Sequence, residues 1–138
     1  MASTDLSDYR PTTDEPFMND RQREYFRNKL QQWKDEIVRE SRDTLEQLAQ
    51  ENNQMPDIAD RASSETDKAL ELRTRDRQRK VISKIDAALR RIESKEYGYC
   101  EETGEPISLQ RLEARPIATL SLEAQERHER SVKIHRDD

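Results

Sequence analysis

Apolar residues recur at helical spacing in two long segments of this chain. The first segment repeats them at intervals of four, three and four residues, at Phe26, Leu30, Trp33 and Ile37. The second repeats them at intervals of three, four and three, at Ile82, Ile85, Leu89 and Ile92. This spacing gathers apolar side chains on one face of an α-helix. We therefore predict a helix over about residues 20–51, with Asn19 or Asp20 as its N-cap, and another over about residues 57–96.

A short turn separates the two predicted helices. Asn52, Asn53 and Pro56 interrupt the pattern, because a residue that precedes proline disfavours helical geometry. Two helices joined by so short a turn pack antiparallel, as a helical hairpin. About 33 residues per helix, at roughly 1.5 Å each, gives arms on the order of 50 Å.

Folding the chain symmetrically about Pro56 predicts which residues face one another. Leu30 is expected opposite Ile82, and Phe26 opposite Ile85, so the base of the hairpin is apolar. Toward the middle the seam instead meets polar side chains, at Glu40, Ser41, Arg75 and Gln78. We expect a firm base and a softer middle, with weaker protection from amide exchange in the middle.

The segments that flank the hairpin differ from it in composition. Residues 1–16 contain Ser, Thr, Asp and two prolines, and we predict a flexible N-terminal arm. Residues 17–96 form the predicted antiparallel coiled-coil hairpin, with its tip at 53–61. Residues 97–138 form a small globular region and a C-terminal helix, which Ser121 is placed to cap. The predicted core of this region is apolar, at Ile107, Leu109, Leu112, Ile117 and Leu120. The fold class expected is mainly α.

Composition and charge narrow the class of protein. Charged residues make up 40% of the chain and apolar ones 31%, as in disordered chains and long-helix proteins, and the periodicity favours helices. A formal charge of −5 argues against a basic nucleic-acid binder. With one cysteine, no signal-peptide pattern and no apolar run long enough to span a membrane, we expect a cytoplasmic protein.

Two carboxylates occupy the predicted tip of the hairpin. Asp57 and Asp60 lie three residues apart at the start of the second helix, followed by the small Ala62. One of them is explained equally well as a helix N-cap. The pair at the outermost point also suits a reaching tip that contacts a metal site, a mobile loop or basic groups of a partner. No pocket forms at an exposed two-helix tip, so catalysis by this chain alone is not expected.

Basic residues form a stripe on the second helix. Arg73 and Arg77 belong to it, together with Lys80, Lys84 and Arg91. A solvated helix face supported by charge pairs explains this pattern. The alternative is a stripe that binds phosphates or an acidic protein surface. Base stacking is not expected, because no aromatic residue interleaves with the stripe.

The spacing of a four-cysteine zinc site is present without its cysteines. The four positions are Cys100, Thr103, Ser121 and Ala124, and only one of them carries a thiol. Three of these side chains do not make a structural zinc site. A lone cysteine is otherwise explained as a small, partly buried side chain.

Several stretches together resemble the DksA family (DnaK suppressor protein) of bacterial transcription regulators, over about residues 17–124. They are Met18-Asn19, Phe26 to Trp33, Asp57-x-x-Asp60-x-Ala62, Leu70 to Arg73 with Arg75 to Arg77, Tyr97-Gly98-Tyr99-Cys100 and Arg111-Leu112-Glu113-Ala114-Arg115-Pro116. The resemblance implies a coiled-coil hairpin that inserts into the secondary channel of RNA polymerase. Its tip then acts near the active site, destabilises open promoter complexes and inhibits ribosomal RNA promoters while activating some others. The nucleotide guanosine tetraphosphate (ppGpp), the effector of the stringent response, strengthens the effect.

The resemblance also assigns residues to these roles. Asp57, Asp60 and Ala62 match the functional tip, and the helix that carries Arg73 and Arg77 faces the rim of the channel. Lys84 and Arg115 match basic positions for guanosine tetraphosphate, at a site shared with polymerase, and a tetraphosphate needs several cations. The protein is expected to be a monomer without enzymatic activity, sequence-specific DNA binding or membrane attachment.

Two departures from the family pattern matter. Thr103, Ser121 and Ala124 replace zinc cysteines, so the chain resembles zinc-independent members with one cysteine, and we expect no bound zinc. In that case Thr103 and Ala124 are expected to fill the former metal cavity. Gln125 replaces a basic residue that many members place near the nucleotide, which bears on the strength of the nucleotide response.

Two other functions fit the same hairpin. A secondary-channel factor of the GreA type would use the tip carboxylates to help polymerase cleave RNA. A plain coiled-coil adaptor would bind a partner helix or an anionic surface, and its tip carboxylates would be dispensable.

Overall fold

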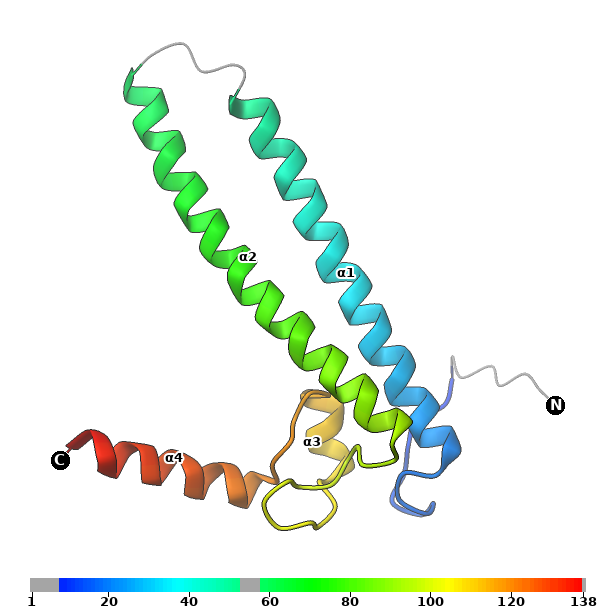
Figure 1. The fold of residues 1–138 in the computed structure, drawn as a ribbon. Helices are drawn as coiled ribbons and strands as arrows, with labels where there is room; N and C mark the ends of the chain where they lie inside the picture. The colour runs from blue at the N-terminus through cyan, green and yellow to red at the C-terminus, as the bar shows by residue number, and fades with distance from the viewer. Residues whose placement is uncertain (1–7, 53–57, 138) are drawn as a thin grey trace. The chain divides into compact units, whose positions relative to one another are not determined.

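The structure is a computed structural model that describes residues 8–52 and 58–137. Four helices follow in order: α1 Asp20–Asn52, α2 Ile58–Glu93, α3 Leu109–Ala114 and α4 Leu122–Asp137 (Figure 1). Within those two ranges the only extended pairing is an isolated antiparallel bridge between Tyr99 and Pro106. The mainly α fold class is confirmed. None of the described helices is both long and apolar enough to cross a membrane.

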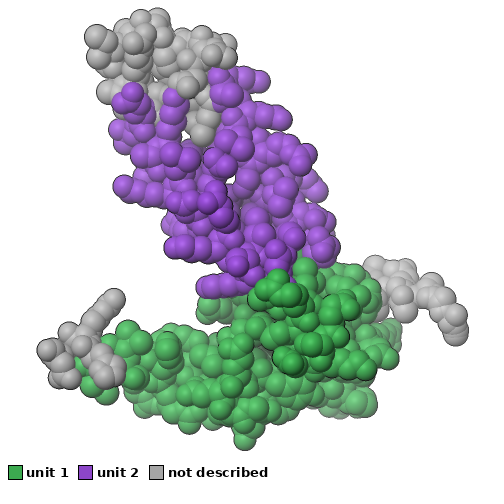
Figure 2. All heavy atoms as spheres, viewed as in Figure 1, with its two compact units in different colours: residues 1–30, 87–138 green, residues 31–86 purple. Residues whose placement is uncertain are grey.

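The chain divides into two compact units (Figure 2). Unit 1 combines residues 1–30 with 87–138, and unit 2 comprises residues 31–86. Both long helices contribute to both units, so each unit contains an α1 segment and an α2 segment.

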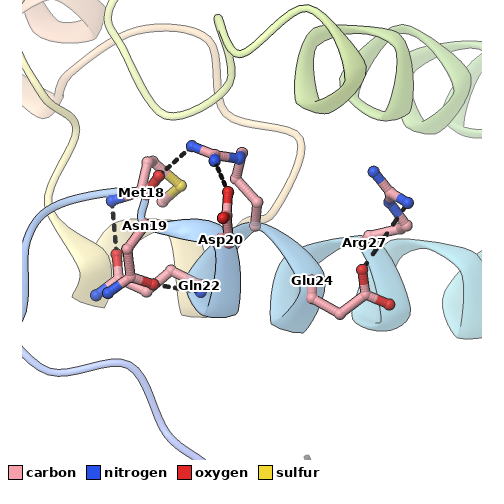
Figure 3. Close-up of polar contacts among 7 residues, drawn as sticks. Met18, Asn19, Asp20, Gln22, Glu24 and Arg27 are labelled. Atoms are coloured by element: carbon pink, nitrogen blue, oxygen red, sulfur yellow. Dashed lines mark hydrogen bonds and ion pairs between the residues drawn. The ribbon is translucent and has the colours of Figure 1, made fainter. Parts of the chain in front are cut away.

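Local side-chain contacts fix the start of α1, in unit 1. The Asn19 side chain accepts a hydrogen bond from the Gln22 backbone N–H at 2.8 Å, so Asn19 is the N-cap (Figure 3). The Gln22 side chain returns to accept the Met18 N–H at 2.7 Å. Met18 has a φ of 51°, a left-handed conformation that carries the chain sharply into the helix. Of the two predicted caps, Asn19 and Asp20, the structure confirms Asn19.

The segment before α1 is more ordered than a flexible arm. Residues 1–7 of the predicted arm lie outside the described residues, but Tyr9 is buried at 8% exposure. Its hydroxyl donates to Glu15 at 2.6 Å, and the Gln22 amide donates to the Thr12 carbonyl at 3.3 Å. For residues 9–16 the prediction is therefore wrong, because one aromatic ring and a turn of polar contacts hold this stretch on α1.

Unit 2 is an antiparallel pair of helical segments, residues 31–52 of α1 and 58–86 of α2 (Figure 1). Ser41 donates to Gln78 at 2.7 Å, and Lys34 pairs with Asp86 at 2.8 Å. A fold symmetric about Pro56 would instead have placed Ser41 opposite Glu71. Within unit 2, the register predicted by that symmetry is thus wrong by about two helical turns. The pairs predicted for the base, Leu30 with Ile82 and Phe26 with Ile85, followed from the same symmetry. The prediction assumed equal lengths of chain on the two sides of Pro56, and the Ser41–Gln78 and Lys34–Asp86 contacts show a pairing that is offset from this symmetry.

The polar middle predicted for the hairpin is confirmed. The Ser41–Gln78 hydrogen bond lies where an apolar pair would stand in a continuous seam. The larger apolar side chains of unit 2 are partly solvated, with Leu45 at 43% and Leu70 at 54% exposure. Only Ile37 and Ile85 are buried among the described side chains of this unit.

The apolar core lies in unit 1. Phe26 and Leu30 of α1 are fully buried, as are Ala88 and Ile92 of α2. The loop after α2 adds Tyr97 and Ile107 to this core, and α3 adds Leu112. The Tyr97 ring lies 5.6 Å from that of Phe26, and its hydroxyl donates to the Pro116 carbonyl at 2.7 Å.

The turn at Gly98 needs a glycine for two reasons. Its φ of 93° lies in a region that side chains rarely adopt. A Cβ at this position would also stand 3.0 Å from Cγ of Met18. The turns predicted around Cys100 are confirmed: the Ile107 N–H donates to the Gly98 carbonyl at 2.7 Å, and the Cys100 N–H to the Glu105 carbonyl at 2.8 Å.

Candidate functional site

The predicted acidic tip is only partly within the described residues. Asp57 lies outside them, while Asp60 and Ala62 belong to the first turns of α2. The contact role of this tip stays a prediction.

The basic stripe on α2 is solvated in unit 2. Arg73, Arg77 and Lys84 are all exposed. The Arg77 guanidinium donates to the Thr74 hydroxyl at 3.2 Å, one turn away on its own helix. Within the described part of the chain, none of the three cations forms an ion pair, so their charges are available to an anionic partner.

The four positions with zinc-site spacing are brought together in unit 1. The Cys100 thiol accepts hydrogen bonds from the Thr103 hydroxyl and from the backbone N–H of Ser121. The Ser121 hydroxyl accepts the Ala124 N–H at 3.2 Å, which caps α4 as predicted. Cys100 and Ala124 are buried, at 2% and 0% exposure. Thr103 is exposed, so it caps the thiol from outside and does not fill a cavity as expected.

This environment favours the charged form of the cysteine. Burial by itself raises the pKa of Cys100, but hydrogen bonds from Thr103, Ser121 and Glu102 outweigh it and lower the pKa to about 6.

These residues do not fit a structural zinc ion. Zinc sites of this kind take four Cys or His ligands, and this set offers one thiolate, two hydroxyls and a methyl group. Among the described residues, no group of three or more His, Cys, Asp or Glu side chains is placed to hold a metal.

Arg115 stands at the C-terminal end of α3, in unit 1. Its side chain is exposed, and its backbone N–H donates to the Arg111 carbonyl at 2.7 Å. Lys84, the other cation predicted to bind the nucleotide, belongs to unit 2. Gln125 donates to Glu129 at 3.0 Å on α4.

A polar cluster in unit 1 was missed by the sequence analysis. Glu113 of α3 pairs with Lys29 of α1 at 2.6 Å and hydrogen-bonds the Tyr25 hydroxyl, which accepts from Arg10 at 3.0 Å. Lys29 and Glu113 are 84 residues apart in the chain, and no local pattern links residues so distant. The Arg-Leu-Glu-Ala-Arg-Pro stretch, residues 111–116, contains Glu113, but the sequence did not show that Lys29 and Tyr25 contact it.

The architecture defines a class of protein: a helical hairpin combined with a zinc-finger-like module whose metal positions are degenerate. Comparison with known proteins identifies the family. Residues 22–92 match the DnaK suppressor protein DksA N-terminal domain, and residues 95–130 match the prokaryotic dksA/traR C4-type zinc finger. The chain belongs to the DksA family.

Individual relatives agree with this family. The RNA polymerase-binding transcription factor DksA of Caulobacter vibrioides is 72% identical over 132 residues, which is 96% of this chain and 93% of the relative. That of Escherichia coli K12 is 38% identical over 89% of this chain and 82% of its own length. Among solved structures, transcription factor DksA2 from Pseudomonas aeruginosa matches with a TM-score of 0.80 at 37% identity, over 90% of this chain and 94% of that one.

Proposed function

We propose that this chain is a non-enzymatic transcription regulator that binds RNA polymerase in the cytoplasm. The observation that carries the proposal is 72% identity, over 96% of the chain, to a relative named as an RNA polymerase-binding transcription factor. The helix pair in unit 2 supports it. A polar contact joins the two helices where an apolar core would lie, and exposed cations are available to contact an acidic partner surface.

In the proposed mechanism, the hairpin enters the secondary channel of polymerase and its tip acts near the active site. Asp57 and Asp60 contact the mobile elements of the enzyme there, and Ala62 permits close approach. Arg73 and Arg77 face the channel rim, where exposed guanidinium groups pair with carboxylates. Open promoter complexes are destabilised as a result, which inhibits ribosomal RNA promoters.

Guanosine tetraphosphate is the proposed effector. Lys84 and Arg115 supply two cations from this chain, and polymerase supplies the rest of the site. Gln125 adds no charge at a position where many family members carry a basic residue. No zinc is proposed, because only one of the four positions, Cys100, carries a thiol.

In vitro transcription from a ribosomal RNA promoter, with and without guanosine tetraphosphate, tests this function. The change Asp57→Asn with Asp60→Asn is expected to preserve polymerase binding but to abolish inhibition. The matched control is Asp43→Asn with Asp67→Asn, which removes the same charge at exposed positions of unit 2 away from the tip. Equal inhibition by the two double variants would contradict the role of the tip and favour a plain adaptor.

A transcript-cleavage assay on a backtracked polymerase complex separates this function from that of a GreA-type factor. We expect no stimulation of cleavage by the wild-type chain. Cleavage that depends on Asp57 and Asp60 would assign the carboxylates to metal binding within polymerase instead.

A further inference from the structure

The polar cluster around Glu113 ties three parts of unit 1 together. Arg10 precedes α1, Tyr25 and Lys29 belong to α1, and Glu113 belongs to α3. The Glu113 carboxylate pairs with Lys29 at 2.6 Å and accepts a hydrogen bond from Tyr25. Tyr25 also accepts from the Arg10 guanidinium at 3.0 Å. Both the Lys29 and Glu113 side chains are about one-third exposed, at 35% and 32%.

The helix that this cluster fastens is short and depends on contacts outside itself. α3 has 6 residues, too few to be stable alone. Ser108 is the N-cap of α3, and its Leu112 side chain is buried in the core of unit 1. The Arg111 guanidinium donates a hydrogen bond to the Leu120 carbonyl at 2.9 Å. Glu113 adds the described side-chain contact that joins α3 to the polar face of α1.

Arg115, which the proposed function assigns to the effector nucleotide, is the C-cap residue of α3. Arg115 follows Glu113 by two residues, and its backbone N–H donates a hydrogen bond to the Arg111 carbonyl of α3. The Arg115 side chain is exposed, so packing against the described residues does not hold it in place. The direction in which its guanidinium points therefore depends on the position of the end of α3. A guanidinium recognises phosphate only when its fork is oriented toward the oxygens.

We propose that Glu113 is a positioning residue for nucleotide binding, which orients the end of α3 and thereby Arg115 through its contacts with Lys29 and Tyr25. This inference rests on the proposed role of Arg115. Glu113 does not contact the nucleotide itself, because a carboxylate repels phosphate and this one is already satisfied by an ammonium group and a phenol. The same contacts lower the pKa of Glu113 against the opposing effect of its partial burial, so it stays charged at neutral pH.

The measurement is the guanosine tetraphosphate concentration that gives half-maximal inhibition of a ribosomal RNA promoter. Glu113→Gln is expected to raise it by roughly threefold to thirtyfold, the range seen for residues that couple to a site without touching its ligand. Inhibition at zero nucleotide is expected to remain at the wild-type level. Glu105→Gln is the matched control, because it removes the same charge at an exposed position of unit 1 without a side-chain partner among the described residues.

Three further variants separate positioning from general loss of structure. Tyr25→Phe keeps the ring that packs on Phe26 and removes only the hydroxyl, so it should also raise the half-maximal concentration. Lys29→Met should do the same, whereas Lys29→Arg, which retains the ion pair, should behave as wild type. Equal losses with and without nucleotide, together with a lowered melting temperature, would mean that Glu113 is merely structural and would overturn the inference.

The remaining outcomes also decide the question. A wild-type chain that ignores guanosine tetraphosphate would refute the nucleotide part of the proposed function, and this inference with it. A wild-type chain that responds while Glu113→Gln responds equally would refute only the positioning role. A lower half-maximal concentration in Glu113→Gln would show that the carboxylate opposes phosphate by its charge, which contradicts positioning.

Discussion

Replacement of Tyr97 by phenylalanine removes one buried hydrogen bond and little else. Tyr97 is 1% exposed, and its hydroxyl donates to the Pro116 carbonyl at 2.7 Å. The ring stays in place, so the packing against Phe26 at 5.6 Å is retained. Pro116 directly follows Arg115, so the lost bond had joined the turn after α2 to the segment after α3.

The magnitude follows from the carbonyl that is left behind. A buried acceptor without a partner costs about 1–3 kcal/mol, more than the net value of an average hydrogen bond. For a small domain, each kcal/mol lowers the melting temperature by about 4–8 °C. We therefore expect Tyr97→Phe to reduce the free energy of unfolding of unit 1 by about 2 kcal/mol.

Urea unfolding measures this change, and the chain supplies a separate optical signal for each unit. Trp33, the only tryptophan, belongs to unit 2, and all 4 tyrosines belong to unit 1. Tyrosine absorbance therefore follows unit 1, and tryptophan fluorescence follows unit 2. The variant should shift the tyrosine transition to lower urea with an unchanged slope.

Tyr99→Phe is the matched control. Tyr99 is 37% exposed, and its ring packs on Phe17 at 5.3 Å with no described partner for its hydroxyl. Its removal should change stability by less than about 0.5 kcal/mol. If Tyr97→Phe were no more destabilising than Tyr99→Phe, the Pro116 contact would contribute nothing and the reasoning would be refuted.

Three further predictions concern the module that follows α2. Gly98→Ala should destabilise the protein by about 2 kcal/mol or more, by the strain of a φ of 93° and the contact with Met18, while Gly104→Ala, with open space around it, should cost less in the same denaturant titration. The ultraviolet absorbance of the Cys100 thiolate should titrate with a pKa of about 6, below the ordinary cysteine pKa of 9.0. The free energy of unfolding should therefore fall as the pH is lowered from 9 to 6. Cys100→Ser should lose that pH dependence. A zinc chelator should leave the melting curve unchanged, and a large drop in melting temperature would reveal a structural metal.

The helices were predictable because the signals that define them are local. The spacing of Phe26, Leu30, Trp33 and Ile37 set the first helix, and the short polar side chain of Asn19 marked its start. Observed ends at Asn52 and Glu93 fall within a few residues of those expected. Periodicity and capping act over one or two turns, which a sequence displays directly.

The register of the hairpin was not predictable in the same way. Symmetry about Pro56 is a rule of thumb, whereas Ser41–Gln78 and Lys34–Asp86 are contacts between residues far apart in the chain. When the middle of the contact between two helices is polar, a shift of one helix by two turns buries almost the same apolar side chains. The hydrophobic pattern alone therefore does not distinguish the two registers. The ordered stretch at Tyr9 escaped prediction for a related reason, since its polar composition resembles that of a flexible arm.

By itself, the sequence determined the two long helices, the degenerate metal positions and the family to which the chain belongs. These follow from residue type and spacing along the chain. Only the tertiary structure decided the register of the hairpin, the environment of Cys100 and the contacts of Glu113. Each of these depends on which groups meet across many residues, because burial and hydrogen bonding are set by neighbours in space.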